Sequence, residues 1–237
     1  MRVHAELHEA CAVPTEVIVA TPGIGRTADD WAVLQAQLAE NYSLAAWDLP
    51  GHGQSPVPDD LSEYTRDRAI DDLDDVTAWT GATAPVMLGH SLGGYLTMAW
   101  AVARSSHAPE ARPDAISPKA LVLMATGPGF RDDEKRDAWN ARSRRNAHRF
   151  GVPPQAAELN CQEDSIVIER IPQLNVPTLV LVGSEDRPDI AGGCGYLAKK
   201  MPNATLVTID GGDHLMHEHP DHSALIADQI RAFLVEL

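Results

Sequence analysis

The chain of 237 residues has few cysteines, few basic residues and no long apolar run. Its three cysteines, Cys11, Cys161 and Cys194, are odd in number and widely spaced. This spacing does not fit a disulfide framework and indicates a reducing compartment, so we expect a cytoplasmic protein. No run approaches the roughly 18 apolar residues that a membrane-spanning helix needs. The first residues also lack the apolar core of a signal peptide.

Basic residues are outnumbered by acidic ones. The sequence holds 19 Lys and Arg against 34 Asp and Glu, which gives a formal net charge of −15. Nucleic-acid binding depends on basic side chains that displace counterions from phosphates, and anionic membranes attract basic segments. The charge balance therefore argues against nucleic acid and membrane as partners. With 44% hydrophobic residues, the composition is that of a globular chain that can bury a sizeable core.

Short apolar runs alternate with helical patterns along most of the chain. An alternating segment at residues 2–8 indicates a half-buried edge strand. Further runs of strand length lie at 17–20, 44–47, 86–88, 121–124, 179–182 and 206–209. Continuous apolar runs suit strands covered on both faces, as in parallel sheets. The sequence therefore predicts an α/β fold with a mostly parallel sheet of about seven to eight strands and helices on both faces.

One long segment interrupts this alternation. After the run that ends at Met124, the next strand begins only near Thr178, and the residues between are polar, partly helical and rich in proline. An insertion at the carboxyl end of a strand lies over the usual ligand crevice of an open α/β sheet. We therefore divide the chain into a core of residues 1–125 and 177–237 and a small helical lid of residues 126–176.

Residues 89–93 read Gly-His-Ser-Leu-Gly, after a predicted strand and before a helical pattern. In that context the pattern is typical of a nucleophile elbow, a strained turn that needs small residues at both flanks and exposes the serine hydroxyl. The helix N-terminus that follows stabilises developing negative charge. The motif identifies Ser91 as the candidate nucleophile.

A serine nucleophile needs a general base and an acid that orients the base. With a nucleophile elbow, these follow along the chain in the order serine, acid, histidine. Asp186 and His214 each follow a predicted strand, so both are expected at the strand ends where the ligand crevice lies. We predict Asp186 as the acid and His214 as the base, with Glu185 and Asp189 as alternatives for the acid. Gly192, Gly193 and Gly195 suggest a mobile loop beside this acid.

Four histidines crowd into nine residues near the C-terminus: His214, His217, His219 and His222. Histidine is a common zinc ligand. However, no cysteine lies nearby, and Pro220 falls between His219 and His222, so no helix fixes these side chains on one face. We expect no metal site, and we expect His217, His219 and His222 to lie on the surface.

Together, these segments resemble the α/β-hydrolase superfamily, in particular its lid-bearing serine esterases and its ester or C–C hydrolases with a short cap. The resemblance covers nearly the whole chain. It rests on residues 48–55 (Asp-Leu-Pro-Gly-His-Gly-Gln-Ser), 89–94, 183–186 and 212–220. The resemblance implies an α/β-hydrolase fold and serine chemistry that requires no cofactor.

The resemblance also implies an oxyanion hole, with one departure from the family pattern. The family usually carries His-Gly after its third strand, whereas this chain has Pro22 before Gly23. By that match the backbone N–H groups of Ile24 and Leu92 receive the oxyanion. Proline lacks an N–H, but the donor lies two residues further on, so the hole can survive.

Candidate substrate contacts come from the loops and the lid: Gly23, His90, Trp139 and Phe150, with Ile166 as a further apolar lid contact. Seven basic residues also lie between residues 131 and 149, including Arg142, Arg144 and Arg145. They either attract an anionic substrate or form a solvated helix face paired with acidic residues.

These observations predict a serine hydrolase that cleaves a small carboxylic ester, lactone or thioester through an acyl-enzyme. Its partner is then an ester-like small molecule, neutral or anionic, and we expect a monomer or homodimer. Two alternatives remain: a C–C bond hydrolase of a vinylogous diketone, which uses the same triad, and a non-enzymatic small-molecule sensor on the same fold.

Overall fold

The fold is built on one seven-stranded sheet in the order β1-β3-β2-β4-β5-β6-β7. The computed structural model describes residues 1–11, 16–105 and 116–237. The strands are β1 (Ala5–His8), β2 (Glu16–Thr21), β3 (Tyr42–Trp47), β4 (Val86–His90), β5 (Ala120–Met124), β6 (Thr178–Gly183) and β7 (Ala204–Ile209). Strand β1 pairs antiparallel with β3, and all other pairs are parallel. The predicted α/β fold with a mostly parallel sheet is confirmed.

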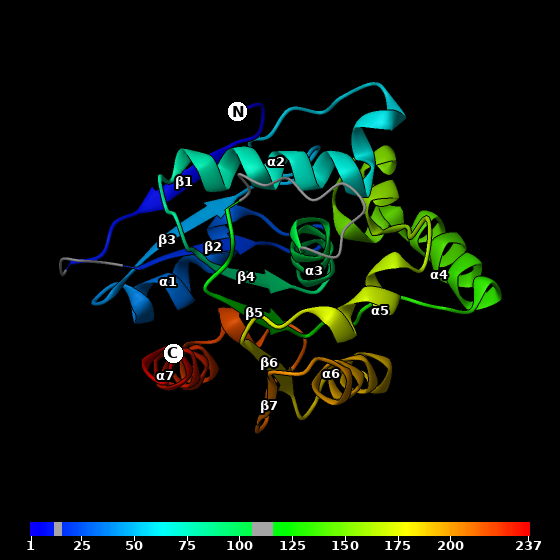
Figure 1. Cartoon of the computed structure of the whole chain (residues 1–237). Coiled ribbons are helices and arrows are strands. Elements are labelled where there is room, and N and C mark those ends of the chain that lie inside the picture. Colours follow the sequence, from blue (N-terminus) through cyan, green and yellow to red (C-terminus); the bar gives the residue numbers. More distant parts are fainter. Residues whose placement is uncertain (12–15, 106–115) are drawn as a thin grey trace.

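Helices cover both faces of the sheet (Figure 1). Helix α1 (Ala32–Leu38) packs with α7 (Pro220–Val235), and α2 (Arg66–Trp79) packs with α3 (Leu92–Arg104). Strands β3, β4, β5 and β6 are buried along their whole length, as their continuous apolar sequences predict. Strand β7 differs from the prediction, since Leu206 is 38% exposed. It is the last strand of the sheet, so its apolar run is only partly covered.

Between β5 and β6 the chain leaves the sheet for about fifty residues. This β5–β6 excursion contains α4 (Asp133–Arg145), α5 (Ile166–Arg170) and the 3-10 helices η3 (Ala147–Phe150), η4 (Pro154–Asn160) and η5 (Ile171–Gln173). The Asp132 side chain caps α4 by accepting a hydrogen bond from the Lys135 N–H. Helix α5 contacts α3, and η4 contacts the short helix η2 (Leu61–Tyr64). The excursion thus packs on the core near the loops that follow the carboxyl ends of the strands (Figure 1).

The segment that follows β6 is a helix, not the loop that its glycines suggested. Helix α6 spans Pro188–Lys200 and includes Gly192, Gly193 and Gly195. Each glycine costs a helix about 1 kcal/mol relative to alanine. Burial of Ile190, Cys194 and Leu197, spaced four and three residues apart, offsets that cost by placing an apolar stripe against β6 and β7.

A search of the helices in the described ranges finds none with the length and apolarity needed to cross a membrane.

Candidate active site

Ser91 lies in a strained turn between β4 and α3. Its backbone has φ 53° and ψ −116°, a region that costs a non-glycine residue about 1–3 kcal/mol. The glycines on either side permit this turn. A Cβ on Gly89 would lie 2.4 Å from the Gly93 carbonyl oxygen, and a Cβ on Gly93 would lie 2.1 Å from that of Thr21. The predicted elbow geometry is therefore present at Ser91.

The side chains of Ser91, His214 and Asp186 form a hydrogen-bonded chain. His214 Nε2 lies 3.1 Å from Ser91 Oγ, and His214 Nδ1 lies 3.0 Å from Asp186 Oδ2. Because a carboxylate only accepts hydrogen bonds, the His214 proton is on Nδ1, and the Nε2 lone pair faces the serine hydroxyl. The Asp186 side chain is fully buried, whereas that of His214 is 30% exposed. The structure thus brings the three predicted residues together in the order needed for proton transfer.

The two alternatives for the acid lie elsewhere. The Asp186 carboxylate also accepts the Arg187 N–H at 2.7 Å, which fixes its orientation. Glu185 is exposed. Asp189 lies between two arginines, 3.3 Å from Arg187 and 3.8 Å from Arg142. Of the three carboxylates, Asp186 is the one that contacts His214.

Thr126 supports the strained elbow in a way that the sequence did not reveal. Its hydroxyl donates to the Ser91 carbonyl at 2.7 Å, and the Ser91 N–H donates to the Met124 carbonyl at 2.9 Å. Met124 is the last residue of β5, the strand beside β4, and Thr126 follows two residues later. The only signal in the sequence was the place of Thr126 just after a buried strand.

The segment that carries Gly23 passes directly beside the nucleophile. A Cβ on Gly23 would lie 3.0 Å from His90 Nδ1 and 3.3 Å from Ser91 Cβ, so a side chain at this position would be tightly confined. Leu92 is the first residue of α3, and the first N–H groups of a helix have no acceptor within the helix. These placements are compatible with an oxyanion hole formed by the N–H groups of Ile24 and Leu92, which stays a prediction.

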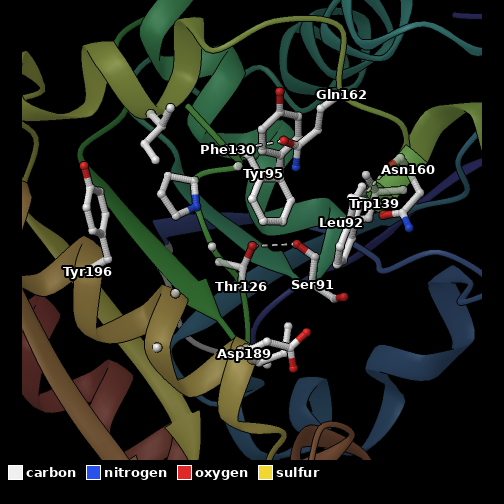
Figure 2. Close-up of a pocket in the computed structure, with 18 of the residues that line it drawn as sticks. Ser91, Leu92, Tyr95, Thr126, Phe130, Trp139, Asn160, Gln162, Asp189 and Tyr196 are labelled. Atoms are coloured by element: carbon white, nitrogen blue, oxygen red, sulfur yellow. Dashed lines mark hydrogen bonds between the residues drawn. The ribbon is translucent and has the colours of Figure 1, made fainter. Parts of the chain in front are cut away.

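A cavity of about 490 Å³ opens beside Ser91. Figure 2 shows its aromatic and polar side chains around the nucleophile. Its lining comes from the elbow, the loop after β5, the excursion and α6: Ser91, Leu92, Tyr95, residues 125–130, Lys135, Trp139, Asn160, Gln162, Ile168, Asp189, Ile190, Gly192, Gly193 and Tyr196. This volume and apolar character are typical of small-molecule sites.

Some of the predicted substrate contacts line this cavity and others do not. Trp139 is part of the lining, and Ile168 lines it in place of Ile166, which is 46% exposed. Gly23, His90 and Phe150 are not among the lining residues. The backbone of Phe150 instead packs against Gly25, whose Cβ would lie 2.4 Å from the Phe150 carbonyl oxygen.

Hydrogen bonds and ring contacts fix the aromatic wall of the cavity. Trp139 Nε1 donates to the Asn160 carbonyl at 2.7 Å, and Gln162 Oε1 accepts the Phe130 N–H at 3.2 Å. The rings of Phe130 and Trp139 lie 5.7 Å apart. The wall is therefore held in place before any ligand binds.

Three of the four arginines of α4 contact carboxylates, Arg136 that of Asp133, Arg142 that of Asp189 and Arg144 that of Glu158, and no arginine is among the described residues that line the cavity. Arg144 forms a two-point ion pair with Glu158 at 2.8 Å. Arg142 lies over the Trp139 ring and 3.8 Å from Asp189. Lys135 is the cation among the lining residues. This arrangement matches the interpretation of a paired helix face for these arginines.

His217 is buried, contrary to the expectation of a surface position. Its side chain is 1% exposed and packs between the rings of Trp31 and His90, with centroids 4.8 and 4.5 Å away and the rings tilted by 40° and 47°. The prediction failed because residues 216–218 form a short 3-10 helix that packs against α1 and the short helix Ala28–Trp31. His219, in contrast, is 55% exposed.

No group of three or more His, Cys, Asp or Glu side chains in the described part of the chain could hold a metal ion.

Cys161 and Cys194 are buried. Burial raises the pKa of each thiol to about 11, so both stay protonated and poorly nucleophilic near neutral pH.

Residues 17–224 match the model of the alpha/beta hydrolase family. A pimeloyl-[acyl-carrier protein] methyl ester esterase of Chromobacterium violaceum is 28% identical, over 85% of this chain and 89% of that protein. A proline iminopeptidase of Pestalotiopsis fici is 29% identical, but the match covers only 47% of this chain and 36% of that protein.

Solved structures show the same fold at low sequence identity. MenH from S. aureus has a TM-score of 0.80 at 19% identity, with 98% of both chains covered. The enol-lactonase from Burkholderia xenovorans LB400 has a TM-score of 0.76 at 17% identity, with 98% of this chain and 96% of that chain covered.

Burial of His217 predicts acid sensitivity. Burial, with smaller contributions from Arg26, His214 and His219, lowers the pKa of His217 from 6.5 to about 3. Below about pH 6.5 the unfolded chain therefore binds a proton that the folded chain does not. Stability falls as the pH drops toward 3, by up to about 3 kcal/mol at pH 4.5 from this residue.

We expect His217→Phe to lose less stability than the wild type between pH 7 and pH 4.5, as measured by urea unfolding at each pH. His219→Phe is the control, since folding leaves that exposed side chain in water. An equal loss of stability in His217→Phe and the wild type would show that burial of His217 does not cause acid sensitivity.

Proposed function

The chain belongs to the alpha/beta hydrolase family, and we propose that it is a serine hydrolase of small carboxylic esters, lactones or thioesters. The observation that carries the proposal is the chain of hydrogen bonds from Asp186 through His214 to Ser91, at the edge of a largely apolar cavity. This arrangement can activate a hydroxyl for attack on an acyl carbonyl.

Acylation uses the 3.1 Å contact between Ser91 Oγ and His214 Nε2. As the oxygen attacks the carbonyl carbon, its proton moves to Nε2, and the buried Asp186 carboxylate stabilises the imidazolium that forms. The oxyanion of the tetrahedral intermediate is received by the N–H groups of Ile24 and Leu92, aided by the N-terminus of α3. His214 then donates the proton to the leaving alcohol or thiol.

Deacylation repeats the same steps with water. His214 accepts a proton from water as the water oxygen attacks the acyl-enzyme carbonyl, and it returns that proton to Ser91 Oγ when the acid departs. Every proton is thus carried by His214, and neither half-reaction requires a cofactor.

Two features support the substrate class. The chain resembles a methyl ester esterase over most of its length, and the cavity wall is mainly apolar with few polar groups. We propose that the cavity takes the acyl part of the ester and that residues 126–176 act as a lid over it. Lys135 is then the residue placed to contact an anionic group on the substrate, since it is the cation among the lining residues, while Arg142 and Arg144 pair with carboxylates.

Loss of the nucleophile tests the proposal. We expect Ser91→Ala to lower turnover of p-nitrophenyl butyrate by about 10⁴-fold or more, as in enzymes whose triads are broken. Ser105→Ala, at the opposite end of the same helix, is the matched control. A panel of esters, lactones and a vinylogous 1,5-diketone separates ester from C–C hydrolysis.

Near-wild-type turnover in Ser91→Ala would contradict the serine mechanism. A single slow turnover in the wild type, in place of saturable kinetics, would favour the sensor.

The glycines of α6 allow a test of the cavity as the acyl site. A Cβ on Gly192 would meet no atom within 4 Å, and Gly192 lines the cavity. Gly195 is equally open but lies outside the lining. We expect Gly192→Leu to lower kcat/KM for p-nitrophenyl octanoate by about 10-fold or more relative to the acetate, because the leucine side chain competes with the long acyl chain for the same space.

Gly195→Leu gains the same helix propensity and should keep the wild-type preference between the two esters. If both variants, or neither, change the ratio of octanoate to acetate turnover, the acyl group does not bind in this cavity.

A further inference from the structure

His90 precedes the nucleophile but lies away from the substrate cavity. Its side chain is 1% exposed, and it is not among the residues that line the space beside Ser91. Its ring lies instead behind the base, with its centroid 4.9 Å from that of His214. A direct contact between His90 and substrate therefore does not fit this geometry.

One hydrogen bond connects the elbow to the backbone of the base. His90 Nε2 lies 2.8 Å from the His214 carbonyl oxygen. Because a carbonyl only accepts, His90 carries its proton on Nε2. Nδ1 is then the unprotonated nitrogen. It has no hydrogen-bond partner among the described residues and faces Gly23, whose Cβ would lie 3.0 Å away.

The surroundings of His90 keep its ring neutral and in one orientation. The His217 ring packs against it with a centroid distance of 4.5 Å, and the Trp31 ring lies 4.8 Å from that of His217. Burial, with smaller contributions from His217, His214 and Arg26, lowers the pKa of His90 well below its usual value. The donor on Nε2 is therefore present throughout the neutral pH range.

The loop that carries His214 is attached to the rest of the fold at several points. The Gly212 carbonyl accepts the Glu185 N–H at 2.8 Å, the Gly211 N–H donates to Ser184 Oγ at 2.8 Å, and Glu218 forms an ion pair with Arg26. The two hydrogen bonds connect the loop to the segment just before the acid, and the ion pair connects it to the segment after β2. The bond from His90 connects this loop to the elbow, at the residue directly before Ser91.

We propose that His90 is a positioning residue, which holds the backbone of His214 at a fixed distance from the nucleophile elbow. This inference rests on the proposed serine mechanism, because His90 acts through His214 and touches no substrate. Without the bond, the His214 loop can shift relative to Ser91. A misplacement of about 1 Å in a reacting group can cost about 100-fold in rate.

The test compares donor-free and donor-bearing replacements. His90→Leu and the unbranched His90→Met remove the donor, whereas the amide nitrogen of His90→Gln can occupy the position of Nε2. With p-nitrophenyl butyrate, we expect both donor-free variants to lose about 10- to 100-fold in kcat with KM within about 3-fold. His90→Gln should recover most of kcat. Melting temperatures for all variants monitor the fold.

A second measurement requires no substrate. The His214 Nδ1–H proton, held by Asp186, should give a low-field proton NMR signal in the wild type and in His90→Gln. In the donor-free variants this signal should broaden and exchange faster with water, because the imidazole is less well held.

The outcomes separate the two proposals. An inactive wild type whose low-field signal depends on residue 90 as described contradicts the serine hydrolase but supports the positioning role. A low-field signal that is equally sharp in His90→Leu, His90→Met and the wild type overturns the positioning role, whatever the ester assay shows. Equal kcat in an active wild type and in both donor-free variants overturns it as well.

Discussion

The strained backbone at Ser91 is the constraint on which the rest of the site depends. A positive φ at a serine is unfavourable, and contacts from the surrounding elements hold it in place here. Gly89 and Gly93 let the end of β4 lie close to the start of α3, and the start of α3 lie close to the end of β2. A Cβ at either glycine would collide with a backbone carbonyl oxygen of the neighbouring element. The Thr126 hydroxyl holds the Ser91 carbonyl from the neighbouring strand. The hydroxyl of Ser91 is thereby held at the head of α3.

The parallel sheet brings the other site residues to this serine. Strands β4, β5, β6 and β7 are neighbours in the sheet and run in the same direction, so their carboxyl ends lie along one edge. Ser91 follows β4, Asp186 follows β6 and His214 follows β7. Strand order thus helps to bring residues more than 120 positions apart within 3.1 Å of each other. The bond from His90 to the His214 carbonyl then connects two of these loops directly.

The sequence predicted the sheet and the three residues that the structure brings into one hydrogen-bonded chain, because their signals are local. Apolar runs of strand length mark the buried strands, and glycines on both sides of a serine mark a strained turn. It missed features that depend on packing between distant segments. The burial of His217 depends on Trp31, and the role of Thr126 depends on the pairing of β4 with β5. The glycines of α6 indicated a loop because glycine lowers the stability of a helix, and this effect can be seen in the local sequence. The apolar side chains of α6 offset that loss by packing on β6 and β7, and this packing cannot be seen in the local sequence.

The proposed function depends on Ser91 acting as a nucleophile that is activated by His214 and Asp186. Reaction with a fluorophosphonate probe, followed by intact mass spectrometry and peptide mapping, tests this role. We expect one adduct per chain, located on Ser91, that forms far more slowly in His214→Ala and in Asp186→Asn. No adduct on the wild type, or an adduct on another residue while ester turnover is lost, would contradict it.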